Sequence, residues 1–156
     1  MAIGLDVGTS AVRVAVLEPH RGGPPRLFRH SEVALPRGAV VDGDVVEGAA
    51  VADALRKLWE VAGLRRRDVA VGLASQKVTV RQLDLPDLPE EELGDAVRLQ
   101  AQDQLPMPVD QALIDHVVVD RYQVDGERRN VRVLLVAAEQ DMVERLSAPA
   151  RGLDEH

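Results

Sequence analysis

The residues best suited to chemistry stand near the start of the chain, in the run Asp6-Val7-Gly8-Thr9-Ser10. Glycine lets a backbone approach a phosphate closely, and successive N–H groups in a tight turn form an anion-binding nest. The hydroxyls of Thr9 and Ser10 add donors, and Asp6 is suited to hold a metal-bound water beside phosphates. The run therefore predicts a phosphate-binding turn, although an ordinary hairpin turn is the alternative. It is neither a P-loop nor a G-x-G-x-x-G motif.

Other reactive residue types form weaker patterns. The histidines have no metal-ligand spacing and are interpreted as surface residues: His20, His30, His116 and His156. Arg65–Arg67 follows a predicted helix end, where basic residues suit the helix dipole, and a weak contact with an anionic surface is the alternative. The acidic run Glu90–Glu92 is interpreted as the charged start of a helix rather than an acid/base pair.

Composition excludes several classes of protein. The chain has 156 residues, 46% of them hydrophobic, no cysteine, and a formal net charge of −7. The apolar fraction is typical of a globular protein, and the acidic balance argues against a nucleic-acid binder. Without cysteine there is no disulfide scaffold or cysteine zinc site. Asp6 interrupts the first apolar run, and no run is long enough to span a membrane, so we expect a cytoplasmic protein without direct membrane insertion.

The first half of the chain alternates between strand and helix patterns. In chain order we expect strands over 3–7, 11–17 and 27–35, a helix over 48–62, and strands over 69–73 and 78–83. The first two strands form a hairpin around the phosphate-binding turn, because apolar and other residues alternate on both sides of it. The helix is predicted from Val51, Leu55, Leu58 and Ala62, which share one face, and Gly63 is expected to end it.

The second half predicts a smaller unit of similar kind. In chain order we expect a helix that begins at Pro89 and stops before Pro106, a strand over 112–124, an Asp125-Gly126 turn, a strand over 130–138 and a helix over 139–148. Residues Pro149–His156 are expected to fray. Mixed elements of this kind indicate an α/β or α+β fold, and we divide the chain into domains over 1–82 and 83–156 that pack together.

Several stretches, taken in order, match a known pattern. They are Gly4–Arg13, Leu35-Pro36-x-Gly38, Asp42-Gly43, Val78-x-x-Arg81 ahead of Leu85-Pro86, Leu88–Leu93, Leu105–Pro108, Asp115–Asp120 and Val133–Ala138. The chain in these stretches resembles the PilM family of type IV pilus assembly, over nearly its whole length. The resemblance implies an α/β, actin-like (ribonuclease H-like) subdomain of the branch shared with FtsA. It also implies an inserted strand–helix–strand–strand subdomain, which would correspond to residues 80–138.

The resemblance also implies a nucleotide site and a partner. Nucleotide contacts would come from Asp6, Gly8, Thr9, Ser10 and Arg13, with Asp6 holding Mg²⁺ through a water when ATP is bound. In the family, the cytoplasmic amino-terminal segment of the membrane protein PilN docks in a groove between the two subdomains. We expect a scaffold that docks such a segment, at the inner face of the membrane. We expect Arg81, Leu93 and Val97 to line the groove, with core packing as the alternative for the two apolar residues.

The chain also departs from the family pattern. Members are longer, and their remaining part brings a second phosphate loop and adenosine-binding glycines. Arg13 stands where the family has lysine, and Ser147–His156 no longer follows it. We interpret the chain as a fragment or a shortened form that binds ATP weakly and does not hydrolyse it, because half a cleft leaves phosphates open to water. An open sheet edge would invite self-association. The alternatives are the nucleotide-binding half of an actin-superfamily ATPase or kinase, and an FtsA-like division or filament scaffold.

Overall fold

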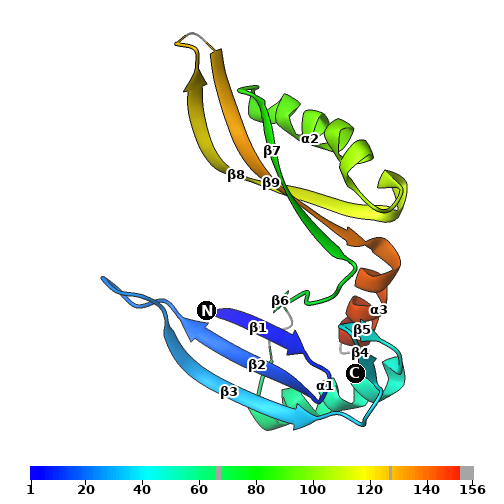
Figure 1. Cartoon of the computed structure of the whole chain (residues 1–156). Helices are drawn as coiled ribbons and strands as arrows, with labels where there is room; N and C mark the ends of the chain where they lie inside the picture. The colour runs from blue at the N-terminus through cyan, green and yellow to red at the C-terminus, as the bar shows by residue number, and fades with distance from the viewer. Residues whose placement is uncertain (66–67, 127, 152–156) are drawn as a thin grey trace. The chain divides into compact units, whose positions relative to one another are not determined.

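The computed structural model describes residues 1–65, 68–126 and 128–151 of the chain (Figure 1). The chain divides into two compact units. Unit 1 takes Met1–Gln76 and resumes at Met142, whereas unit 2 takes Lys77–Asp141. Each unit combines a β-sheet with helix, so the α/β class expected from the sequence is confirmed.

The main sheet of unit 1 has four strands in the order β3-β2-β1-β6. They are β1 (Ala2–Val7), β2 (Ala11–Glu18), β3 (Arg26–Ala34) and β6 (Ala70–Val71). The first three form an antiparallel meander, and β6 runs parallel to β1. Buried and exposed residues alternate along β1, as the sequence pattern predicts for a sheet with one covered face.

Helix α1 (Gly48–Ala62) supplies the apolar side chains that pack on this covered face. The core combines strand residues with helix residues: Ile3, Leu5, Val12, Val14, Val16, Val51, Leu55, Leu58 and Trp59. Both Leu55 and Leu58 are fully buried, and burying one such side chain contributes about 1.5–3 kcal/mol. The helical spacing seen in the sequence therefore marks the residues that hold α1 on the sheet.

The end of α1 follows the prediction. Gly63 has a φ of 60°, a left-handed conformation that glycine adopts without strain. Its N–H donates to the Glu60 carbonyl at 3.0 Å, and the Leu64 N–H donates to the Trp59 carbonyl at 3.0 Å. This pair of bonds closes the helix. The guanidinium of Arg29 on β3 donates a further hydrogen bond to the Ala62 carbonyl.

The segment between β3 and α1 contains two short strands that the sequence did not predict. Strands β4 (Val40–Val41) and β5 (Asp44–Val45) pair in an antiparallel hairpin. Asp42 and Gly43 turn the chain between them with φ values of 51° and 79°. Strands of two residues are too short to produce a recognisable alternation, so the region resembled a plain connector.

Helix α3 (Gln140–Arg151) returns the chain to unit 1. Leu146 is buried in the first core, and the Arg145 guanidinium donates two hydrogen bonds of 2.9 Å to the Asp44 carboxylate. The expectation that fraying begins at Pro149 was wrong for residues 149–151, because Pro149 is buried and the helix continues. Residues 152–156 lie outside the described part of the chain.

The observed boundary between the units differs from the boundary between residues 82 and 83 that we expected from the sequence. Strand β7 (Val78–Pro86) is continuous through that point and pairs along its length with β9 (Arg128–Glu139). The boundary therefore falls before β7, at Gln76 and Lys77. Unit 2 ends at Asp141 because α3 packs into the core of unit 1.

Unit 2 is a three-stranded antiparallel sheet with one helix. Its order is β7-β9-β8, with β8 (Ala112–Val124) following a short 3-10 turn at Val109–Gln111. The predicted turn between β8 and β9 is confirmed at Asp125 and Gly126, which have φ values of 53° and 79°. Helix α2 (Glu90–Gln104) buries three residues spaced by four against the central strand: Leu93, Val97 and Ala101. Figure 1 shows α2 alongside the sheet.

Candidate functional site

The turn between β1 and β2 brings the five predicted nucleotide-contacting residues together. Asp6 and Arg13 are register partners on the two strands, and Gly8, Thr9 and Ser10 form the turn that joins them. Thr9 and Ser10 are exposed. The turn therefore presents two hydroxyl groups to solvent beside a carboxylate and a guanidinium.

Gly8 closes this turn against the chain itself. Its N–H donates to the Ala11 carbonyl at 3.0 Å. A Cβ at this position would lie 3.0 Å from Nη1 of Arg13 and 3.1 Å from the Ala11 carbonyl oxygen, tighter than most real Cβ contacts. The Leu35 N–H donates to the Ser10 carbonyl at 2.8 Å and ties the turn to the end of β3. A side chain at Gly8 would therefore need Arg13 or the Ala11 carbonyl to shift by a few tenths of an ångström.

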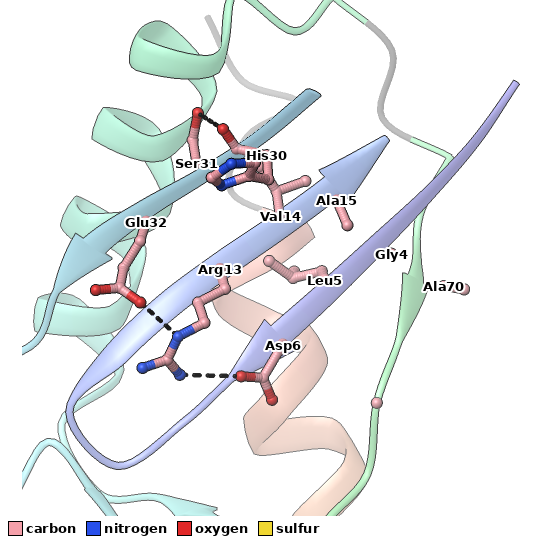
Figure 2. A pocket seen from close by; sticks show the side chains of 11 residues that line it. Gly4, Leu5, Asp6, Arg13, Val14, Ala15, His30, Ser31, Glu32 and Ala70 are labelled. Atoms are coloured by element: carbon pink, nitrogen blue, oxygen red, sulfur yellow. Dashed lines mark hydrogen bonds and ion pairs between the residues drawn. The ribbon is translucent and has the colours of Figure 1, made fainter. Parts of the chain in front are cut away.

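Arg13 lies between two carboxylates on the face of the sheet opposite α1 (Figure 2). Its Nε donates to Glu32 at 2.5 Å and its Nη1 donates to Asp6 at 3.2 Å. The hydrogen bond with Glu32 and then that with Asp6 raise the pKa of the Arg13 guanidinium further above its ordinary value. All three side chains are substantially solvent-exposed, so each ion pair contributes little to stability.

A shallow hollow lies beside this row of charges. It has a volume of about 450 Å³ and is lined by small, apolar, charged and polar residues: Gly4, Leu5, Asp6, Arg13, Val14, Ala15, His30, Ser31, Glu32, Ala70 and Gly72. Figure 2 shows Asp6, Arg13 and Glu32 along one side of it. The small side chains leave the backbone of three adjacent strands close to the surface.

The nucleotide implied by the resemblance fits this turn only in part. The Gly8 N–H is already bonded to a carbonyl, and the two carboxylates around Arg13 repel an approaching phosphate. The hydroxyls of Thr9 and Ser10 remain suitable donors, and Asp6 is suitable for a metal-bound water. Within residues 1–65, 68–126 and 128–151, no group of three or more metal-ligating side chains could hold a metal ion. The turn therefore supplies only some of the groups that a phosphate site needs.

The predicted groove residues are not brought together on one surface. Leu93 and Val97 are 0% and 1% exposed, and both pack into the core of unit 2 under α2. They offer no surface to a docked peptide, so the core alternative describes them. Arg81 is exposed on β7 and donates to the carbonyl of Val80 at 3.0 Å. Apolar spacing on a helix indicates a buried face without saying what covers it.

The sequence analysis missed an apolar surface on the β7-β9-β8 sheet of unit 2, on the face away from α2. The register places three rows of residues on the face opposite α2: Val78, Ala138 and Leu113; Val80, Val136 and Asp115; Gln82, Leu134 and Val117. We call this the open face of unit 2. Val80, Leu113 and Val117 are 51%, 47% and 59% exposed. The signal is available in the sequence as apolar residues at both alternating positions of β8 and β9, which predicts that neither face is fully polar.

Charged residues border the open face. Asp115 belongs to its second row, and Asp84, Arg132 and Asp120 form the next row along the sheet. Arg132 donates to Asp84 at 2.9 Å and its guanidinium lies 5.0 Å from the Tyr122 ring centre. The hydrogen bond from Arg132 lowers the pKa of the Asp84 carboxyl, with a further contribution from Tyr122. Arg132 is therefore already paired, and Asp115 and Asp120 give this border an acidic balance.

None of the helices within the described residues combines the length and apolar character that crossing a membrane would require.

Comparison with known proteins gives one family and two informative structures. The family described as type IV pilus assembly protein PilM matches residues 4–153. A chain in the solved structure of a PilM–PilN type IV pilus biogenesis complex is 29% identical and matches 97% of this chain with a TM-score of 0.80. The present chain spans 44% of that chain's length.

The second structure is the cytoplasmic domain of EpsL, an inner membrane component of the type II secretion system of Vibrio cholerae. It matches 94% of this chain and 52% of its own chain, with a TM-score of 0.52 and 12% sequence identity. At this identity the likeness concerns the fold alone.

Proposed function

The chain belongs to the PilM family of type IV pilus assembly proteins, and we propose that it docks the cytoplasmic amino-terminal segment of a PilN-like inner-membrane protein. The observation that carries the proposal is the similarity of nearly the whole chain to a protein solved in a PilM–PilN complex. Such docking would hold this protein at the inner face of the membrane through its partner.

The open face of unit 2 is the surface we assign to this segment. Val80, Leu113 and Val117 are about half exposed or more, with Leu134 and Val136 partly buried between them. Monomeric proteins rarely leave contiguous apolar surface on a sheet without a binding role. Fully covering one such side chain contributes about 1.5–3 kcal/mol, so a few apolar residues of a peptide can bind here.

The acidic border of the open face supports this choice of partner. Asp115 and Asp120 are both exposed, and Asp120 directly follows the irregularity in the β8–β9 register. Cytoplasmic segments next to a membrane span carry an excess of lysine and arginine. A basic segment with apolar anchors therefore matches the open face in both charge and polarity.

The test is a calorimetric titration of the chain with a synthetic peptide of the PilN cytoplasmic segment from the same organism. We expect binding, and we expect Val117→Arg to weaken it at least about tenfold by removing apolar contact and repelling basic residues. The matched control is Leu99→Arg, because Leu99 is 65% exposed on α2 and faces away from the open face. Flat titrations with a folded sample, or equal effects of the two variants, would contradict the assignment.

We propose further that ATP and Mg²⁺ bind tightly at Asp6, Gly8, Thr9, Ser10 and Arg13 only within a longer family member. The hydroxyls of Thr9 and Ser10 would donate hydrogen bonds to the phosphates of bound ATP. Arg13 is paired with two carboxylates, which would repel the phosphates of ATP. We therefore expect this chain to bind the nucleotide weakly and not to hydrolyse it. Titration with Mg-ATP checks the first expectation. A steady ATPase rate that Asp6→Ala abolishes would overturn the second.

A further inference from the structure

The hairpin that joins β2 to β3 extends away from the core of unit 1. Every residue from Leu17 to His30 is exposed, including the last two residues of β2 and the first five of β3. Figure 1 shows this hairpin projecting beyond the other strands of the sheet. We call Leu17–His30 the hairpin tip. It takes no part in the nucleotide turn or in unit 2.

The hairpin tip carries large apolar side chains. Leu27 and Phe28 are 57% and 56% exposed, and Leu17 is 38% exposed. The chain has one phenylalanine, one tryptophan and one tyrosine, and Trp59 is buried in the core. The single phenylalanine is therefore kept at the surface, next to an exposed leucine. Adjacent exposed apolar residues of this size indicate a binding surface.

The same residues are basic in a chain that is acidic overall. The hairpin tip contains three arginines, two histidines and one carboxylate, Glu18, whereas the whole chain has a net charge of −7. Arg21, Arg26 and Arg29 are all exposed. Positive charge is therefore concentrated where the apolar residues are exposed, which favours an anionic and partly apolar ligand.

Apolar side chains occupy both faces of the hairpin tip. Leu27 is the register partner of Leu17, on the face opposite α1. Phe28 falls at the irregularity in the β2–β3 register and lines a hollow of about 230 Å³ on the other face, together with Arg29, Leu64 and Arg65. A protein partner normally covers one face of a hairpin. A surface into which the whole tip can dip would cover both faces.

The base of the hairpin tip is held firmly. The Arg29 guanidinium donates to the Ala62 carbonyl at the end of α1 and lies 5.5 Å from the Phe28 ring centre. Near the loop, the Arg26 guanidinium lies 2.9 Å from the Nε2 atom of His20 and donates a hydrogen bond to it. Arg26 is therefore held beside His20, and Arg21 is exposed in the loop next to them.

We propose that the hairpin tip is a peripheral membrane contact that binds anionic phospholipid headgroups. Arg21 and Arg26 contact lipid phosphates, while Leu27 and Phe28 enter the boundary between headgroups and acyl chains. Basic residues with exposed apolar neighbours bind this boundary through both electrostatic attraction and apolar burial. The contact lies on the membrane without spanning it. It is additional to PilN docking and does not depend on it.

The experiment is flotation of the whole chain with vesicles of 70% phosphatidylcholine and 30% phosphatidylglycerol, compared with pure phosphatidylcholine. We expect binding only to the anionic vesicles. The charge-reversal pair Arg21→Glu and Arg26→Glu should lower the partition coefficient at least about tenfold, because each arginine near an anionic surface favours binding severalfold. Raising NaCl from 0.1 M to 1 M should release the protein, since the Debye length falls from about 10 Å to about 3 Å.

Two further variants separate the parts of the proposal. Leu27→Ser with Phe28→Ser should weaken binding while retaining its salt dependence. Arg56→Glu with Lys57→Glu changes the net charge equally on the exposed surface of α1 and should leave the hairpin's contribution intact, with a severalfold smaller effect. A folded chain that ignores anionic vesicles, or responds equally to both charge-reversal pairs, would overturn the proposal. So would binding to polyglutamate without binding to the vesicles.

Discussion

The two units use the same construction and leave different surfaces open. Each sheet buries one face under a helix, with Leu55 and Leu58 of α1 in unit 1 and Leu93 of α2 in unit 2. In unit 1, the other face has glycine, alanine and the charged row around Arg13. In unit 2, the other face has valine and leucine, including Val117 at 59% exposed.

This difference indicates which open face is suited to a protein partner. Small and charged residues interact well with water, so the part of the unit 1 sheet around Arg13 needs no cover for stability. Covering the exposed valines and leucines of unit 2 with a partner removes them from water and therefore favours binding. One chain thus combines a hydrated surface beside the Gly8 turn with an apolar face that we assign to docking.

Substitutions in the two cores have the largest expected effects on stability, and they test whether the two units unfold independently. Leu55→Ala should cost unit 1 about 2–5 kcal/mol, and Leu93→Ala should cost unit 2 a similar amount, because both side chains are 0% exposed. Fluorescence of Trp59, the one tryptophan, follows unit 1. Amide hydrogen exchange of β7–β9 follows unit 2.

We expect each substitution to lower the unfolding midpoint of its own unit by far more than that of the other. The two substitutions serve as controls for each other. If Leu93→Ala lowered the Trp59 midpoint as much as Leu55→Ala does, the units would unfold as one cooperative body and the comparison would fail.

A pair of glycines gives the next largest effect. Gly43 in unit 1 and Gly126 in unit 2 both have a φ of 79°. A Cβ at Gly43 would overlap the carbonyl of Ala74, whereas a Cβ at Gly126 would meet nothing within 4 Å. Gly126→Ala should cost about 1–2 kcal/mol through backbone strain alone, and Gly43→Ala should cost clearly more. Urea unfolding of the two variants measures this difference, and equal losses would contradict it.

The smallest expected effect is the loss of stability of unit 2 at acid pH. The hydrogen bond from Arg132 lowers the pKa of Asp84 in the folded state, so this carboxylate contributes stability above its ordinary pKa of 3.8. That contribution is lost as the pH falls below about 4. The effect is small because the pair is solvent-exposed.

Asp84→Asn removes this titration while keeping a similar shape. We expect the variant to have a lower urea midpoint than the unmodified protein at pH 6, followed by NMR signals of unit 2. The gap should narrow toward pH 3. A gap that is constant with pH would mean that Asp84 acts through packing rather than charge.

Most of the secondary structure could be predicted because its patterns are local. Helix α1 matches its expected bounds, since apolar residues spaced along one face are ended by a glycine that adopts positive φ. Strand β8 also matches, because the Asp125-Gly126 turn follows it. Strands β4 and β5 were missed because two residues give no period. The end of α3 was missed because burial of Pro149 depends on residues far away in the sequence.

For the candidate sites too, local motifs could be predicted from the sequence, whereas surfaces built from distant segments could not. The turn at Gly8 is a local motif, and its five predicted residues do lie together. The open face of unit 2 depends on the register of three strands, which places Val80 near Val136 and Leu134 near Val117. For Leu93 and Val97 the sequence left both groove lining and core packing open, because spacing reveals an apolar face without identifying its cover, and their burial shows that they belong to the core.

The return of the chain to unit 1 at α3 has a consequence for folding during synthesis. Unit 1 needs Leu146 for its core, but the ribosome adds the whole of Lys77–Asp141 first. At 5–20 residues per second, that insertion takes roughly 3–13 s to synthesise. Unit 2 is continuous in sequence and can complete its core while unit 1 still lacks α3. The unit that begins last is therefore expected to finish first, and the early strands of unit 1 stay open to chaperones until α3 emerges.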